Sequence, residues 1–354
     1  MHKMVSALAF VVLLSTIVAT SQAEEADKMQ RAQQDLLRQG RNLTADQAAA
    51  LEAAAAANPD DLDARLQLLG YYFRTKFQSK EASRAHQEIV LWLINHDAES
   101  PILGSPEARI FAPLNPEGFR QAANLWDEKT KAPDAKAQVL GNAADFFLLA
   151  DKEKAEQLLK RAQKLEPESV EWMQRLGRLF QIQSQGAETE AKKELSKKAL
   201  AEFERATKRM DDRQIYVHLA DLAKTAFAAG EDQKAEKYAK RLLSLEDENE
   251  NKWNSGNAVH HGNLILGRVA LRAGDVDKAN DYLLKAGATK GSPQLNSFGP
   301  NMALAKDLLE NGERGVVLEY FTLCGKFWDR DELKAWREQV EQGKTPQFGA
   351  NLMY

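Results

Sequence analysis

Two adjacent histidines, His260 and His261, are the residues of this 354-residue chain whose type first suggests metal chemistry. Asp247 and Glu248 come shortly before them and could add carboxylate oxygens. Neighbouring helical residues point about 100° apart, whereas two metal ligands on one helix normally stand at positions i and i+4. Packing and hydrogen bonding are therefore the simpler interpretation. The sequence predicts no metal site but leaves metal binding near this pair open.

Two other segments have part of the spacing of a known binding loop. Residues 247–253, DENENKW, resemble the start of a calcium loop, but Lys252 stands at the position of the required glycine. Gly343–Thr345 resembles the end of a phosphate-binding loop, but Glu338 stands where the first glycine belongs. Neither pattern is complete, so both segments are interpreted as polar surface.

Nucleophilic catalysis has no strong candidate. Cys324 is the only cysteine, and it falls at a small, inward-facing position of an expected helix. This position favours a packed thiol over a nucleophile, since no base stands at motif spacing. The motifs G-x-S-x-G, H-E-x-x-H and C-x-x-C do not occur. We therefore predict no catalytic residue, no cofactor and no enzymatic activity.

The N-terminus has the pattern of a secretory signal peptide over residues 1–23. A short basic start leads into an apolar run over 4–19, and Ser21 and Ala23 occupy positions −3 and −1 of a cleavage site. The acidic residues that follow supply no positively charged stop-transfer flank. We expect cleavage after Ala23 and an exported protein, periplasmic or extracellular, without stable membrane insertion. The alternative is a retained N-terminal anchor.

The charge balance argues against a polyanionic partner. The chain has 48 Lys and Arg against 52 Asp and Glu, a formal net charge of −4, and loss of Lys3 with the signal peptide takes it from −4 to −5. Nucleic-acid binders need a concentrated basic face that displaces counterions from phosphates. We therefore expect no nucleic-acid partner.

An internal repeat organises the rest of the chain. One segment has the spacing of the second helix of a tetratricopeptide repeat, A-x3-F-x2-A-x4-P, at Ala155, Leu159, Ala162 and Pro167. The residues that precede it stand where the first helix of this repeat carries W-x2-L-G-x2-Y: Val139, Asn142, Ala143 and Phe146. Small residues at the Gly and Ala positions let the paired helices approach closely.

The same frame recurs in three later hairpins and in two weaker copies at the ends. The later hairpins are Met173–Phe180 with Ala199–Ala206, Leu219–Ala226 with Ala235–Leu242, and Leu266–Ala270 with Ala279–Ala286. The weaker copies are Leu66–Phe73 with Ala82–Ile89, and Leu304–Leu308 with Val317–Cys324. The chain thus resembles the tetratricopeptide repeat superfamily. It departs from the template in lacking the first-helix Trp and in placing Asn142, Asn263 and Asn301 at core-facing positions.

This resemblance implies an all-α fold, a right-handed solenoid of tetratricopeptide-like helical hairpins with a polar C-terminal closing helix. Thr44 with Gln47, and Asn115 with Pro116, are the expected helix starts. The expected organisation is a signal peptide (1–23), an N-terminal helical segment (24–62), a repeat array (63–325) with a proline-rich connection at about 95–116, and a capping helix and tail (326–354).

The C-terminal part of the chain carries a second resemblance. Residues Trp253–Tyr354 resemble the closing part of exported bacterial repeat proteins that have no assigned activity. This likeness implies a bacterial source and no mechanism.

One row of residues suggests a binding surface. Position 9 of the first helix is basic in the last four repeats: Arg178, Lys224, Arg268 and Lys306. Repeats in register present equivalent positions on one face, so these cations are expected to line a concave groove. Further residues expected in this groove are Phe227 and Met302, together with Gln174, Gln181, His261 and Leu264. A chance excess of basic residues at one position is the alternative.

These observations favour a non-enzymatic scaffold for protein–protein interaction that binds an extended peptide segment and could accept an acidic one. Solenoids of this type offer extended concave surfaces. The alternatives are an exported protein that binds a metal or small ligand, or an enzyme that uses the polar loops at 95–115 and 245–262.

Overall fold

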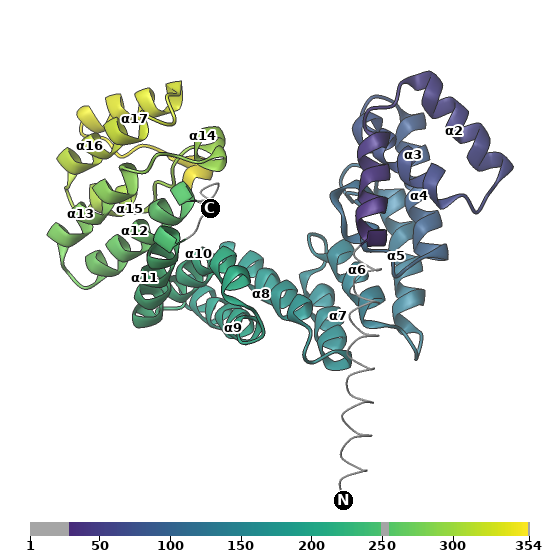
Figure 1. Cartoon of the computed structure of the whole chain (residues 1–354), viewed down its shortest axis with the longest axis horizontal. Helices are drawn as coiled ribbons and strands as arrows, with labels where there is room; N and C mark the ends of the chain where they lie inside the picture. The colour runs from purple at the N-terminus through teal and green to yellow at the C-terminus, as the bar shows by residue number, and fades with distance from the viewer. Residues whose placement is uncertain (1–27, 249–254, 353–354) are drawn as a thin grey trace, which may run out of the picture. The chain divides into compact units, whose positions relative to one another are not determined.

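The computed structural model describes residues 28–248 and 255–352, and every regular element in these ranges is a helix (Figure 1). The predicted fold class, an all-α solenoid of helical hairpins, is confirmed. The chain divides into two compact units, Met1–Glu168 (unit 1) and Ser169–Tyr354 (unit 2). The predicted signal peptide and its cleavage site lie outside the described residues.

Unit 1 contains hairpins joined by the proline-rich connection. The helices α3 and α4 pair with each other, as do α6 and α7, in agreement with the sequence spacing. Its elements are a helix over residues 28–40, α2 (Ala45–Ala57), α3 (Leu62–Thr75), α4 (Lys80–His96), the short 3-10 helices η1 (Pro101–Gly104) and η2 (Pro106–Ala108), α5 (Pro116–Lys131), α6 (Ala137–Phe147) and α7 (Lys152–Leu165).

Two helices of unit 1 begin at the residues predicted to cap them. The backbone N–H of Gln47 donates to Thr44 Oγ1 (3.3 Å), and Thr44 N–H donates to Gln47 Oε1 (2.9 Å), which forms a capping box at α2. At α5, Gly118 N–H donates to Asn115 Oδ1 (2.9 Å) and Pro116 is the first helical residue. The caps satisfy N–H groups that have no partner within the helix.

The helix over residues 28–40, which falls within the expected N-terminal helical segment (24–62), packs against α3 through two glycines. A Cβ atom added to Gly70 would lie 2.1 Å from the carbonyl oxygen of Leu37, and one added to Gly40 would lie 1.9 Å from that of Gln67. The two backbones therefore meet where neither residue has a side chain. Position 70 therefore requires glycine because the N-terminal helix lies against it.

The proline-rich connection folds into η1 and η2 and is held by a polar core residue. The side-chain amide of Asn142 donates to the carbonyl oxygens of Ala98 and Ser100, at 2.9 Å each. Asn142 is fully buried. A polar residue at this core-facing position therefore satisfies the backbone at the start of the connection.

Unit 2 consists of consecutive hairpins that pair α8 with α9, α10 with α11, α12 with α13 and α15 with α16, as the sequence spacing predicted. Its elements are α8 (Val170–Gln185), α9 (Thr189–Thr207), α10 (Asp212–Ala228), α11 (Asp232–Glu248), α12 (Ser255–Arg272), α13 (Val276–Gly287), α14 (Pro293–Phe298), α15 (Ala303–Glu310), α16 (Arg314–Cys324), α17 (Asp331–Glu341) and η4 (Gly349–Leu352).

Glycines at the expected small positions bring these helices together. A Cβ atom on Gly177 would lie 2.4 Å from the ring of Phe203, and one on Gly267 would lie 2.3 Å from Leu304 Cδ2. At the turns between paired helices, Gly230 and Gly274 have φ values of 77° and 84°. This left-handed conformation suits glycine and ends the first helix of each hairpin.

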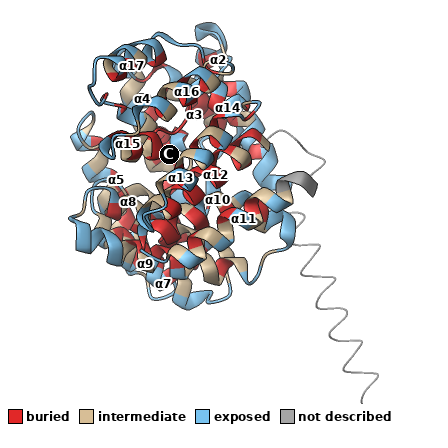
Figure 2. Cartoon of the chain, turned by 90° about the vertical axis from the view of Figure 1, so that its left-hand side faces the viewer, coloured by how far each residue is buried: buried red, intermediate tan, exposed pale blue. Residues whose placement is uncertain are grey.

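The closing helix α17 has a polar outer face and an apolar inner face, in line with the predicted polar capping helix. Its buried residues are Leu333, Trp336 and Val340. The ring of Trp336 lies 5.6 Å from that of Trp328 and 5.1 Å from that of Phe348, centroid to centroid. In both units the buried residues lie on helix faces that meet, and the outer faces are exposed (Figure 2).

Candidate functional site

The first helices of the unit 2 hairpins, α8, α10, α12 and α15, are connected by polar side chains. Gln174 Nε2 lies 2.8 Å from His218 Nε2, and Gln181 Nε2 donates to Thr225 Oγ1 at 2.8 Å, which links α8 to α10. We call the surface that carries the predicted basic row on these helices the first-helix face. It is defined by Arg178, Lys224, Arg268 and Lys306.

Three of the four cations interact with a residue on the first helix of the following hairpin. Burial lowers the pKa of His218 on α10, Asp221 opposes this, and the charge of Arg178 lowers it further. Burial lowers the pKa of His261 on α12, and the charge of Lys224 adds to this. Arg268 Nε donates to Asp307 Oδ2 on α15 at 2.8 Å. Arg178, Lys224 and Arg268 thus each influence a residue of the next first helix; that the four cations line one groove stays a prediction.

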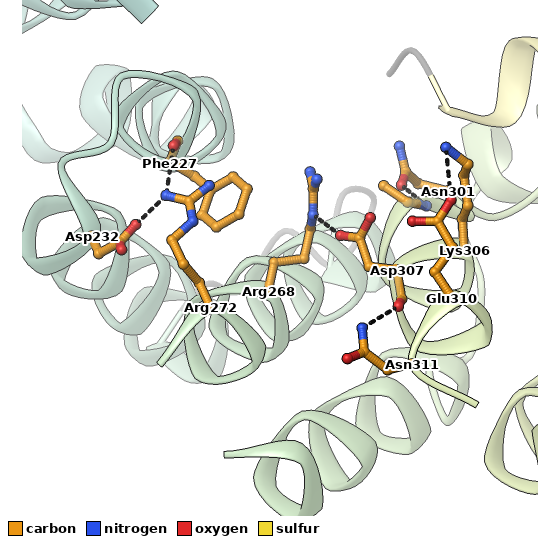
Figure 3. A network of polar contacts seen from close by, with 10 residues as sticks. Phe227, Asp232, Arg268, Arg272, Asn301, Lys306, Asp307, Glu310 and Asn311 are labelled. Atoms are coloured by element: carbon orange, nitrogen blue, oxygen red, sulfur yellow. Dashed lines mark hydrogen bonds and ion pairs between the residues drawn. The ribbon is translucent and has the colours of Figure 1, made fainter. Parts of the chain in front are cut away.

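The four cations differ in their partners. Arg268 forms an ion pair with Asp307, and Lys306 Nζ lies 3.3 Å from Glu310 Oε1 on its own helix (Figure 3). Arg178 and Lys224 form no hydrogen bond or ion pair with any residue that the structure describes. Two charges of the predicted row are therefore neutralised, and two are available.

The ammonium group of Lys224 is partly removed from water. Its side chain is partly exposed, yet burial lowers its pKa, while the neighbouring Asp221 opposes the shift. The nearby imidazole of His261 is buried, and its Nδ1 atom has no hydrogen-bond partner among the described residues. A partly desolvated ammonium group that has a carboxylate nearby but forms no ion pair with it favours a further anion beside it.

A second arginine of α12 contributes to the first-helix face. The guanidinium carbon of Arg272 lies 3.6 Å from the ring centroid of Phe227, and that of Arg268 lies 4.5 Å from it. Figure 3 shows Arg272 between Phe227 and Asp232, whose Oδ1 accepts at 2.5 Å. Arg272 was missed by the sequence analysis, although its i+4 spacing from Arg268 places both on one helix face.

Several residues expected to line an open groove are buried instead. Phe227 is 7% exposed because its ring lies under the guanidinium groups, and Met302 is fully buried. The backbone N–H of Met302 donates to the carbonyl oxygen of Asn351 at 2.8 Å, so the C-terminal segment lies against the start of α15. His261 and Leu264 are also buried, between the helices. The exposed side chains of the first-helix face are therefore polar and charged, whereas the sequence predicted a mixture of apolar and polar groups.

The histidine pair has a structural arrangement. His260 Nδ1 lies 3.1 Å from the carbonyl oxygen of Ala286 and donates to it, while Nε2 accepts from Asn301 N–H at 3.0 Å. Burial lowers the pKa of His260 to about 4. Both ring nitrogens of His260 are thus in use, whereas Nδ1 of His261 has no hydrogen-bond partner among the described residues. The side chains of Asp247 and Glu248 lie outside the described residues, as does most of the calcium-loop-like segment.

The remaining candidates for chemistry are the cysteine, metal-binding clusters and membrane-spanning helices. Cys324 is fully buried, and burial raises the pKa of its thiol, which confirms the packed-thiol interpretation. Among the described side chains, no group of three His, Cys, Asp or Glu could hold a metal ion. Within 28–248 and 255–352, no helix has the length and apolar character needed to cross a membrane.

Comparison with solved structures finds similar chains, among them two structures of human IFIT1. No protein-family model matches the chain, and no curated protein matches it. The human IFIT1 dimer with m7Gppp-AAAA is similar at 17% sequence identity and a TM-score of 0.45, over 84% of this chain and 66% of the IFIT1 chain. The human IFIT1 dimer with PPP-AAAA gives 18% and 0.45, over the same shares. The chain therefore spans 66% of the length of the protein it matches.

One expectation from the sequence is wrong as stated, namely the exclusion of a nucleic-acid partner. The two human IFIT1 structures contain m7Gppp-AAAA and PPP-AAAA, respectively. The physical reason is that net charge does not describe local charge. This acidic chain itself places Arg178, Lys224, Arg268 and Arg272 on neighbouring helices.

Proposed function

We propose that this chain is an exported, non-enzymatic scaffold of tetratricopeptide type whose first-helix face binds a carboxylate-bearing segment of a partner protein. The observation that carries the proposal is the environment of Lys224. This cation is partly exposed and without an ion pair among the described residues, and burial lowers its pKa. A carboxylate placed beside it would replace the hydration that the ammonium group has lost.

The spacing of the available charges fits an extended chain. Packed helices lie about 8–10 Å apart, and an extended peptide advances about 3.3 Å per residue. A segment of roughly five or six residues therefore spans α8 to α12. Its acidic groups would meet Arg178 first, then Lys224, and then the edge of the Arg268–Asp307 ion pair.

The ion pairs on the first-helix face limit which segments can bind. Asp307 and Glu310 already neutralise Arg268 and Lys306, and Asp221 lies beside Lys224. A carboxylate of the bound segment that faced Asp307 or Glu310 would be repelled, since like charges repel. We therefore propose a segment whose carboxylates are spaced to meet Arg178 and Lys224.

The hairpin geometry supports the tetratricopeptide assignment. Gly177 and Gly267 stand at the small first-helix positions of that template, and the structure leaves no room for a larger residue at either. Gly230 and Gly274 stand at the turns of their hairpins with positive φ.

A fluorescein-labelled peptide with glutamate at alternate positions would test the proposal on the full mature chain. The wild type should bind it, and Lys224→Gln should weaken binding at least about fivefold. Lys208→Gln, which removes an exposed charge at the end of α9, is the matched control and should bind like the wild type.

Two outcomes would count against the proposal. Equal binding by the wild type and Lys224→Gln would place the site elsewhere. Binding of a labelled oligoadenylate without binding of the peptide would show that the partner of the first-helix face is a nucleic acid and not a protein.

A further inference from the structure

Unit 1 contains a cavity of about 420 Å³ beside the proline-rich connection. Its walls come from α4, the segment from η1 to Pro113, α5 and the end of α6. The residues that line it are almost all apolar, and four are aromatic: Phe111, Phe119, Trp126 and Phe146. Both the size and the apolar lining are typical of small-molecule sites, which measure about 300–1,000 Å³.

The mouth of the cavity exposes apolar side chains. Phe111 is 39% exposed and Leu149 is 61% exposed, and both line the cavity. Trp126 lies at the inner wall and is 1% exposed. Apolar surface in a concave site is favourable to cover, because an entering apolar group releases water and gains contacts with the walls.

The walls are held in place by polar contacts behind the connection. Lys76 Nζ donates to the carbonyl oxygen of Arg109 at 3.2 Å, and His86 Nε2 donates to that of Glu107 at 2.7 Å. The carboxylate of Glu107 also forms an ion pair with Arg41. These contacts fix the backbone that carries Phe111, so the cavity is formed before any ligand enters.

The α5 and α6 side of the cavity is fixed by stacked rings. The rings of Phe119 and Phe146 lie 4.6 Å apart, centroid to centroid, with an angle of 16° between their planes. The ring of Phe147, which is buried, packs edge-on against Phe146 at 5.0 Å. A preformed aromatic wall loses little side-chain freedom when a ligand binds.

Two charged residues, Arg109 and Asp145, line the cavity, and they differ in whether they already interact with another residue. Arg109 is half-buried, and its guanidinium group makes no hydrogen bond or ion pair with any residue in 28–248 or 255–352. Asp145 takes part in an interaction of its own. The cavity therefore offers one positively charged donor group at an otherwise apolar site.

We propose that this cavity binds a small amphipathic molecule whose apolar chain or ring system fills the aromatic interior and whose carboxylate pairs with Arg109. The site is separate from the first-helix face, since all its residues belong to unit 1. The inference stands independently of the proposed partner binding.

Fluorescence of cis-parinaric acid, a fatty acid with an emitting chain, tests the proposal on the full mature chain. The emission should rise on binding, and dodecanoate should displace the probe. Dodecanol, which has the same chain and no charge, should compete about fivefold less well, and Arg109→Gln should remove most of this difference. Arg120→Gln, at an exposed site of α5 away from the cavity, is the matched charge control.

Two further variants test whether the probe binds in this cavity. Ala112→Trp fills the cavity, and Phe111→Ala removes a ring from its mouth; each should weaken probe binding at least about tenfold. Leu114→Ala, an exposed apolar residue of the same connection that does not line the cavity, should bind like the wild type. Circular dichroism checks that the variants fold, and Phe111→Ala carries the test if Ala112→Trp does not.

Two kinds of result would overturn the proposal. No saturable binding of cis-parinaric acid, or unchanged binding in Phe111→Ala and Ala112→Trp, would show that the cavity is not a ligand site. Equal competition by dodecanol and dodecanoate would show that the ligand is not a carboxylate.

Discussion

The Nζ atom of Lys76 lies 3.3 Å from Nε2 of His86 in the interior of unit 1. Both groups donate to the backbone of the proline-rich connection, at Arg109 and Glu107 respectively. An ammonium group beside an imidazole disfavours a second positive charge. Burial lowers the pKa of His86 to about 3, and the charge of Lys76 adds to this; burial lowers the pKa of Lys76 to about 8.

These shifts predict that the protein becomes less stable as the pH falls. The pKa of His86 is lower in the folded state than the unfolded value of about 6.5, so its contribution is present above pH 6.5 and is lost as the pH falls toward 3. His260, with a pKa of about 4, acts in the same direction in unit 2. For Lys76 the unfolded state binds more protons between pH 8 and 10.5, so stability rises with pH there.

Urea unfolding at a series of pH values measures this effect. Between pH 6 and pH 5 the wild type should lose about 1 kcal/mol more than His86→Gln, because one proton of difference is worth about 1.4 kcal/mol per pH unit. Glutamine keeps a donor for the carbonyl oxygen of Glu107 but cannot titrate. Parallel pH profiles for the two proteins would show that His86 is not held neutral.

The contact between Gly70 and the helix over 28–40 predicts a large effect of one methyl group. Gly70→Ala would place Cβ 2.1 Å from the carbonyl oxygen of Leu37, so the helix must move away or unit 1 must distort. We expect a loss of at least about 3 kcal/mol and faster proteolysis within 28–40. Gly315→Ala is the control, since a Cβ there meets nothing within 4 Å. It should gain about 0.5–1 kcal/mol of helix propensity.

The sequence was sufficient for the fold because each hairpin carries local evidence of its own. Small residues such as Gly177 and Gly267 mark where two helices meet, and Gly230 and Gly274 mark where the chain turns. The contact of Gly70 with Leu37 could not be predicted, since it depends on a helix outside the repeat pattern.

The candidate site was predicted less completely, for physical reasons that individual residues show. Register predicts that Arg178 and Lys224 share one face, and this stays a prediction. The pairing of Arg268 with Asp307 depends on how closely α12 and α15 approach, and the burial of Met302 depends on the C-terminal segment. The cavity of unit 1 depends on long-range contacts of Lys76 and His86 with the connection, which no sequence spacing indicates.

The predicted signal peptide implies a defined mature N-terminus. Ser21 and Ala23 are small enough for the cleavage site, so the exported product should begin at Glu24. Expression in a bacterial host followed by N-terminal sequencing of the periplasmic and medium fractions measures this. Ala23→Arg should block processing, whereas Ala26→Arg, beyond the expected site, should not. An intact Met1 in the membrane fraction would instead mean a retained anchor.

Charge reversal on the first-helix face tests whether its cations act together. In Arg178→Glu/Arg268→Glu, an available cation and a paired one both become acidic, and the second substitution would set a carboxylate opposite Asp307. Binding of the acidic peptide should weaken by more than the roughly 1 kcal/mol expected of exposed charges, and added salt should weaken binding by the wild type. The double reversal should weaken peptide binding more than Arg268→Glu alone, because Arg178, unlike Arg268, has no ion pair among the described residues. Folding should change little, since Arg178 is exposed and Arg268 is partly exposed.

If the double variant binds like the wild type and salt has no effect, the basic row reflects amino-acid composition and has no part in binding.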